Sequence, residues 1–151
     1  MGFILIEDDD FKKKKILDFL NDHFSSEIFY TAGSVTSAID LLKNEAGSQL
    51  ILLDMSLPTY DHEKNSDTGR PQGFGGIEIL RYMEFIGDER KVIVVTQFDS
   101  FTVNGENMNI SHIERQLNDE FSDVFIGVVQ FDVISDSWKN SLINLILESI
   151  K

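Results

Sequence analysis

The segment Leu50-Ile51-Leu52-Leu53-Asp54 is the most apolar run in the chain, and it ends abruptly at a carboxylate. A short, continuous apolar run of this kind is typical of a strand that is buried on both faces of a parallel sheet. Such a strand carries the residue that follows it to the carboxyl end of the sheet. The segment therefore predicts a central strand that presents Asp54 at that edge.

Four other segments also have the composition of strands, because they are short and rich in β-branched or aromatic residues. They are residues 3–6, 28–31, 91–96 and 124–129. Apolar residues recur at helical spacing after each strand, as Ile16, Leu17 and Leu20 do after the first. Five strands that alternate with five helices predict an α/β fold, in which helices cover both faces of a parallel sheet.

Several helix starts carry capping residues. Asp9 or Asp10 is expected to cap the first helix and Ser34 the second, because short polar side chains accept hydrogen bonds from free amides of the first turn. Ser111 and Glu114 have the spacing of a capping box and predict the start of the fourth helix.

Composition limits the classes of partner. The 151 residues include 26 acidic and 13 basic side chains, and the net charge of −13 argues against direct binding to nucleic acid. The run from Lys12 to Lys15 is interpreted as a solvated helical turn, with a docking patch as the less favoured alternative. The chain has no cysteine and no apolar run near the roughly 18 residues needed to span a bilayer, so a cytoplasmic protein without membrane insertion is expected.

Two connections are longer than the usual loop of about 4–6 residues. The chain is expected to form a single domain over residues 1–151, with insertions near 59–75 and 97–110. The first insertion is strongly polar, which fits either a mobile surface segment or an element that recognises a partner.

Acidic residues end two of the predicted strands. Glu7 and Asp8 follow the first strand and Asp54 follows the third, so adjacent strands would bring three carboxylates together. Such a cluster needs a cation, and oxygen ligands of this kind are preferred by Mg²⁺ or Mn²⁺. A carboxylate is also a nucleophile that can accept a phosphoryl group as an acyl phosphate.

Three motifs resemble those of response-regulator receiver domains: Ile4-Leu5-Ile6-Glu7-Asp8-Asp9, Leu52-Leu53-Asp54-Met55-Ser56-Leu57-Pro58 and Val94-Val95-Thr96. The resemblance implies a flavodoxin-like, doubly wound sheet with strand order 2-1-3-4-5. It implies that Asp54 accepts phosphoryl from a histidine kinase or a phosphotransfer protein. It also implies that Glu7, Asp8, Asp54 and the backbone carbonyl of Ser56 bind Mg²⁺, and that Thr96 contacts the phosphoryl group and acts as the switch.

The fifth strand departs from the family pattern. Where receiver domains have a lysine followed by proline, this chain has Gln130 and Phe131, and the position of the usual aromatic switch residue aligns with Gly127. No nearby lysine in the sequence replaces the missing one. We therefore expect Mg²⁺ alone to balance the charge of a phosphorylated Asp54.

Three functions remain open at this point. The favoured one is an atypical single-domain response regulator that is not an enzyme beyond its own phosphorylation and dephosphorylation, and that signals by changing its affinity for a downstream protein. A degenerate receiver that acts as a phosphorylation-independent interaction module is the first alternative. A Mg²⁺-dependent phosphohydrolase is the second, although such hydrolases commonly place an acid where Ser56 stands.

Overall fold

A computed structural model of the chain describes residues 2–45, 47, 49–60, 75–97, 100–103 and 106–150. The strands are β1 (Gly2–Ile6), β2 (Ile28–Ala32), β3 (Gln49–Leu53), β4 (Val92–Thr96), β5 (Ser100–Val103), β6 (Glu106–Asn109) and β7 (Phe125–Gln130). The helices are α1 (Asp10–His23), α2 (Val35–Asn44), α3 (Gly75–Ile86), α4 (Ile110–Glu120) and α5 (Ser137–Ser149). None of these helices is long and apolar enough to cross a membrane.

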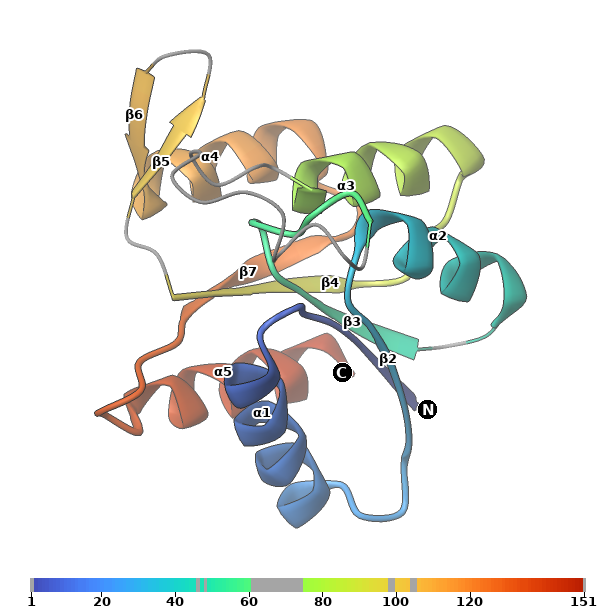
Figure 1. Cartoon of the computed structure of the whole chain (residues 1–151), viewed down its shortest axis with the longest axis vertical. Coiled ribbons are helices and arrows are strands. Elements are labelled where there is room, and N and C mark those ends of the chain that lie inside the picture. The colour runs from blue at the N-terminus through green and yellow to red at the C-terminus, as the bar shows by residue number, and fades with distance from the viewer. Residues whose placement is uncertain are drawn as a thin grey trace.

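The main sheet has five parallel strands in the order β2-β1-β3-β4-β7 (Figure 1). Counted along the chain without the separate β5–β6 pair, this is the order 2-1-3-4-5. The predicted flavodoxin-like α/β fold is therefore confirmed. The strand order places β3 between β1 and β4, so residues that follow these three strands meet at one edge.

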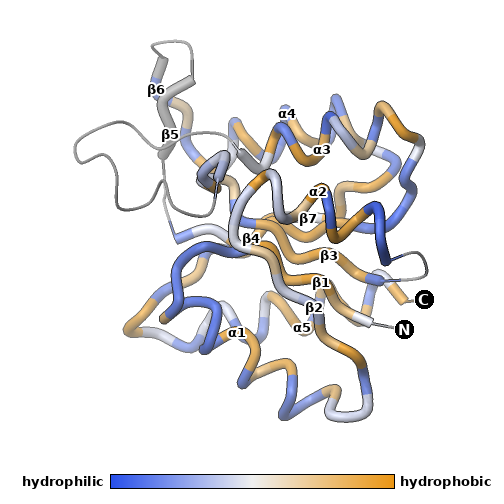
Figure 2. The backbone as a smooth tube through the Cα atoms, turned by 45° about the vertical axis from the view of Figure 1, so that its right-hand side comes forward, coloured by the Kyte–Doolittle hydropathy of each residue, from blue (hydrophilic) through white to orange (hydrophobic). Residues whose placement is uncertain are grey.

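Alternate residues of each strand point into two separate cores. On β3, Leu50 and Leu52 face α1 and α5, whereas Ile51 and Leu53 face α2, α3 and α4. Figure 1 shows the same division, with α1 and α5 on one face of the sheet and α2, α3 and α4 on the other. Because both faces are covered, the central strands are mostly apolar, as the hydropathy colouring of Figure 2 shows for β1, β3 and β4.

The predicted insertion near 97–110 contains a β-hairpin. β5 and β6 pair in antiparallel fashion, from Ser100 opposite Asn109 to Val103 opposite Glu106. Met108 packs against the core that lies under α4, which joins the hairpin to the body of the fold. The other predicted insertion, near 59–75, falls largely on residues 61–74, which lie outside the described part of the chain.

Two of the predicted caps are confirmed and one is wrong. Asp9 caps α1 by accepting from the amide of Lys12, and Ser34 caps α2 through a capping box. Helix α4 begins earlier than expected, because Asn109 caps it by accepting from the amide of His112. Asn109 is also the last residue of the hairpin strand β6. The predicted capping box at Ser111 therefore lies inside the first turn.

Two glycines allow α3 to pack on the loop that follows Asp54. A Cβ atom on Gly76 would lie 2.8 Å from the carbonyl oxygen of Asp54, and one on Gly75 would overlap the carbonyl oxygen of Leu57. The amide of Gly76 donates to the carbonyl of Met55 at 3.1 Å. The start of α3 thus holds the backbone beside Asp54 in place.

Candidate functional site

Backbone hydrogen bonds bring the predicted acidic residues to one edge of the sheet. The amide of Asp54 donates to the carbonyl oxygen of Ile6 at 2.9 Å. The amide of Glu7 donates to the carbonyl oxygen of Ala32, also at 2.9 Å. These bonds continue the strand ladders by one residue. As a result, carboxylate oxygens of Glu7, Asp8 and Asp54 all lie within 4.8 Å of one another.

Buried polar side chains gather at this same edge. Among the described residues, the buried polar or charged side chains are those of Glu7, Lys12, Ser34, Asp54 and Thr96. Each lies at the carboxyl end of a strand or in the first turn of the helix that follows one. Burial of charged groups is costly unless they are paired, so their concentration at one edge marks a site.

Lys12 is the charged residue that the sequence analysis missed. Its Nζ atom lies 2.6 Å from Oε1 of Glu7 and 3.4 Å from Oδ1 of Asp54, and it donates to the carbonyl oxygen of Val95 at 2.8 Å. The side chain is only 2% exposed. An ammonium group has three donors, and these three contacts give each of them a partner.

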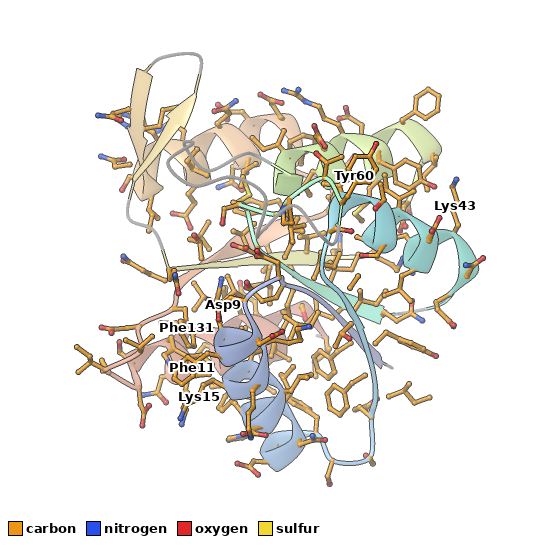
Figure 3. The ribbon with its side chains drawn as sticks, viewed as in Figure 1. Asp9, Phe11, Lys15, Lys43, Tyr60 and Phe131 are labelled. Atoms are coloured by element: carbon orange, nitrogen blue, oxygen red, sulfur yellow. The ribbon has the colours of Figure 1, made fainter. Side chains whose placement is uncertain are left out.

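The start of α1 directs Lys12 into the site. Asp9, marked in Figure 3 at the beginning of α1, accepts from the Lys12 amide at 2.9 Å, while its own amide donates to Oε2 of Glu7 at 3.1 Å. Side chains in a helix tilt towards its N-terminus, which here faces the ends of the strands. The positive end of the helix dipole disfavours a cation in the first turn, so the carboxylates must hold Lys12 there.

The interpretation of the lysine run as a solvated turn is therefore wrong for Lys12. Lys14 and Lys15 are exposed and Lys13 is partly exposed, but Lys12 points inward. The expectation that no lysine offsets the charge of the acidic cluster is also wrong, because Lys12 contacts Glu7 and Asp54. Helical spacing contained the signal, because Lys12 precedes the buried Ile16 by four residues and therefore lies on the inner face of α1.

The carboxylates of the site remain crowded in spite of Lys12. Burial and the neighbouring Asp54 charge raise the pKa of Glu7 to about 8, although Lys12 acts in the opposite direction. Burial, followed by Asp54, raises the pKa of Asp8 to about 6. Both directions are those expected for carboxylates that are buried close to one another.

A cavity opens over these groups. It measures about 240 Å³ and is lined by Glu7, Asp8, Asp9, Lys12, Asp54, Ser56 and Gln97. The Ser56 hydroxyl donates to both carboxylate oxygens of Asp54 at 3.3 Å. The three converging carboxylates of Glu7, Asp8 and Asp54 exceed the charge of Lys12 by two units when fully ionised, and Asp9 adds a further acid to the wall. Its oxygen donors and its charge fit a hard divalent cation such as Mg²⁺.

Thr96 and Gln130 are neighbours at the carboxyl ends of two adjacent strands. They are Cα partners at the ends of β4 and β7, and the carbonyl of Thr96 accepts from the amide of Phe131 at 2.7 Å. Thr96 is buried, with 1% of its surface exposed, whereas Gln130 is exposed and lines a different cavity with Phe131. The structure thus places Thr96 at the predicted edge and leaves the Gln130 side chain outside the group around Asp54.

A side chain at Gly127, the position of the family's aromatic switch residue, would crowd α5. A Cβ atom there would lie 3.1 Å from Cδ1 of Leu145 on α5. Phe131, at the place of the family proline, instead packs against Trp138 of α5 with ring centroids 5.0 Å apart. The end of β7 is therefore built around α5.

Comparison with known proteins gives a consistent result. No protein-family model matches the chain. It is 32% identical over 147 residues to the Detocs response regulatory protein DtcB of Enterobacter cloacae, covering 96% of this chain and 98% of that protein. It is 23% identical over 145 residues to the uncharacterized protein y4jR of Sinorhizobium fredii, covering 95% of each.

Solved structures share the fold. The N-terminal domain of a response regulator/sensory box/GGDEF protein from Carboxydothermus hydrogenoformans matches 99% of this chain and 94% of its own, with 18% identity and a TM-score of 0.63. The receiver domain of the Francisella response regulator 1452 matches 97% of this chain and 95% of its own, with 19% identity and a TM-score of 0.56.

Proposed function

Because the chain belongs to the response regulators, we propose that it is a receiver that accepts a phosphoryl group on the carboxylate of Asp54. The observation that carries this proposal is the setting of Asp54. Its carboxylate follows the central strand, is 4% exposed, and shares a cavity with three more acidic residues and one lysine. A signalling domain fits this family better than an enzyme with an external substrate.

The transfer is a displacement at phosphorus. An oxygen of the Asp54 carboxylate forms a new bond to the phosphorus atom, and the bond from phosphorus to the donor breaks. The leaving group keeps the electron pair. A phosphohistidine donor therefore leaves as neutral imidazole if its other ring nitrogen is protonated, and otherwise takes up a proton as the bond breaks. The product is a mixed anhydride, and attack of water on its phosphorus releases inorganic phosphate and restores the carboxylate.

We assign Glu7, Asp8, Asp54 and the backbone carbonyl of Ser56 as the residues that would hold Mg²⁺ or Mn²⁺. The carboxylates support this by their mutual distances, and Ser56 by its place in the wall of the same cavity. When bound, the cation would neutralise charge on the phosphoryl oxygens during transfer. The Ser56 hydroxyl, which donates to Asp54, holds the carboxylate in position at the end of β3.

We further propose that a histidine kinase or phosphotransfer protein is the donor and that Thr96 reports the modification to a downstream protein. Thr96 is supported in this role by its burial at the end of β4, directly after Val95. A phosphoryl group brings up to about two negative charges and new acceptor oxygens, enough to bias a surface between two states. Self-phosphorylation from small donors and autodephosphorylation are the only catalysis that this function needs.

Intact-mass spectrometry tests the proposal. The wild type, incubated with Mg²⁺ and acetyl phosphate, should gain the mass of one phosphoryl group. Asp54→Asn should gain none, whereas Asp18→Asn, which removes an exposed acid of α1, should behave as the wild type. An unmodified wild type, tested also with histidine kinases from the same source, would instead indicate an interaction module that works without phosphorylation.

A further inference from the structure

Lys12 has a feature that a simple ion pair with Glu7 does not explain. Its Nζ atom also donates to the carbonyl of Val95, on a different strand and 83 positions away in the sequence. The carbonyl belongs to β4, one residue before Thr96. A single buried side chain therefore links the first turn of α1, the Asp54 carboxylate and the end of β4.

The charge of the site supports a role beyond stabilisation. Fully ionised, the cluster of Glu7, Asp8 and Asp54 exceeds the charge of Lys12 by two units, which a bound dication would balance. Asp9 adds a further acid to the cavity wall. A phosphoryl group on Asp54 then adds negative charge in the cavity that Lys12 lines. Gln130, at the place of the family lysine, carries no charge and is exposed. Within the described part of the chain, Lys12 is the basic side chain that lines this cavity.

We infer that Lys12 is the residue that binds the phosphoryl group on Asp54, and that it exchanges its bond to the Val95 carbonyl for one to a phosphoryl oxygen. This inference rests on the proposed function of Asp54. The Val95 carbonyl is a neutral acceptor, whereas a phosphoryl oxygen carries negative charge, so the attraction between opposite charges favours the exchange. Because Lys12 belongs to α1 and is bonded to the end of β4, phosphorylation of Asp54 would change the contacts of both elements.

The fold contains a natural reporter for this change. Trp138 is the only tryptophan of the chain. Its ring lies 5.5 Å from that of Phe19 on α1 and 5.0 Å from that of Phe131, whose amide donates to the carbonyl of Thr96. A shift of α1 or of the end of β4 should therefore alter tryptophan fluorescence.

The test compares Lys12→Met with Lys13→Met. Methionine keeps most of the length of lysine without its charge, and Lys13 is a neighbouring, partly exposed lysine. With Mg²⁺ and acetyl phosphate, Lys12→Met should form the acyl phosphate at least about tenfold more slowly than the wild type, the equivalent of one lost charge contact. It should also lose the change in Trp138 fluorescence. Lys13→Met should retain both the rate and the fluorescence change.

A measurement on the wild type covers the case in which Lys12→Met does not fold. In the wild type alone, phosphorylation should change hydrogen exchange in the first turns of α1 and not in α2.

The outcomes separate the two proposals. If the wild type is phosphorylated and Lys12→Met reacts at the same rate with the same fluorescence change, the inference about Lys12 is wrong while the function of Asp54 stands. Unchanged exchange in α1 of the phosphorylated wild type would also reject it. If the wild type cannot be phosphorylated by any donor, the proposed function and the inference fail together.

Discussion

The Nζ atom of Lys12 lies 2.6 Å from the Oε1 atom of Glu7, although both side chains are only 2% exposed. This buried ion pair joins the end of β1 to the first turn of α1. The desolvation penalty of such a pair is large, so it is weak evidence for stability by itself. Its place beside Asp54 gives it a functional meaning, and several measurable consequences follow from the surrounding geometry.

Removal of one acid should weaken binding of a divalent cation. Asp8→Asn keeps the shape of the side chain but removes a charge from the cluster, so we expect Mg²⁺ affinity to fall roughly tenfold, or about 1.4 kcal/mol. Isothermal titration calorimetry measures this directly, and Asp18→Asn on the outer face of α1 is the matched control. Equal Mg²⁺ affinity in the wild type and Asp8→Asn would show that Asp8 is not a ligand. If neither protein binds Mg²⁺, the proposed metal site is wrong.

The stability of the metal-free protein should depend on pH in a defined direction. The pKa of Glu7 is raised from 4.5 to about 8 and that of Asp8 from 3.8 to about 6. Between the ordinary and the raised values, the folded state holds protons that the unfolded chain has released. The free energy of unfolding contributed by these groups should therefore fall as pH rises from about 5 to about 8.

Urea denaturation at several pH values checks this dependence. Saturating Mg²⁺ should reduce the loss of stability at higher pH, because a metal ion binds the deprotonated carboxylates. Glu7→Gln should have a flatter pH profile than the wild type. A metal-free stability that rises across this window would show that the carboxylates are stabilised in their charged form.

The close approach of α3 should make Gly76 intolerant of a side chain. In Gly76→Ala, the new methyl group would lie 2.8 Å from the Asp54 carbonyl oxygen and from Cα of Met55. Overpacking of this kind costs about 1–3 kcal/mol. Because the displaced backbone carries Asp54, phosphorylation should also slow. Glu84→Ala, on the exposed side of the same helix, should change the free energy of unfolding by less than about 0.5 kcal/mol.

The cap of α1 should matter more than the cap of α5. Asp9→Ala removes the acceptor for the Lys12 amide, and it should lower the free energy of unfolding by about 1 kcal/mol. Asp136, at the N-cap of α5, makes no side-chain capping bond, so Asp136→Ala should cost less. Asp9→Ala should also slow phosphorylation, because the cap sets the direction of Lys12. Equal effects of the two variants in thermal denaturation and phosphorylation assays would contradict this role.

The sequence was sufficient to predict the fold and the acidic cluster. Continuous apolar strands specify a doubly covered parallel sheet, and acids directly after the first and third strands must meet at its carboxyl edge. Lys12 was missed because four consecutive lysines usually form a solvated face, and only the spacing to Ile16 distinguishes the first from the others. The start of α4 was misplaced because the tertiary structure of the β5–β6 hairpin, with Asn109 at its end, overrides the local capping pattern at Ser111.

Chemical trapping of the acyl phosphate tests the central claim most directly. Borohydride reduces an aspartyl phosphate to homoserine, and peptide mapping by mass spectrometry then identifies the modified residue. After reaction with Mg²⁺ and a phosphodonor, we expect homoserine at position 54, and none in a sample kept without the donor. Homoserine at Asp8 or another acid, with Asp54 unchanged, would contradict the assignment of Asp54 as the phosphoacceptor.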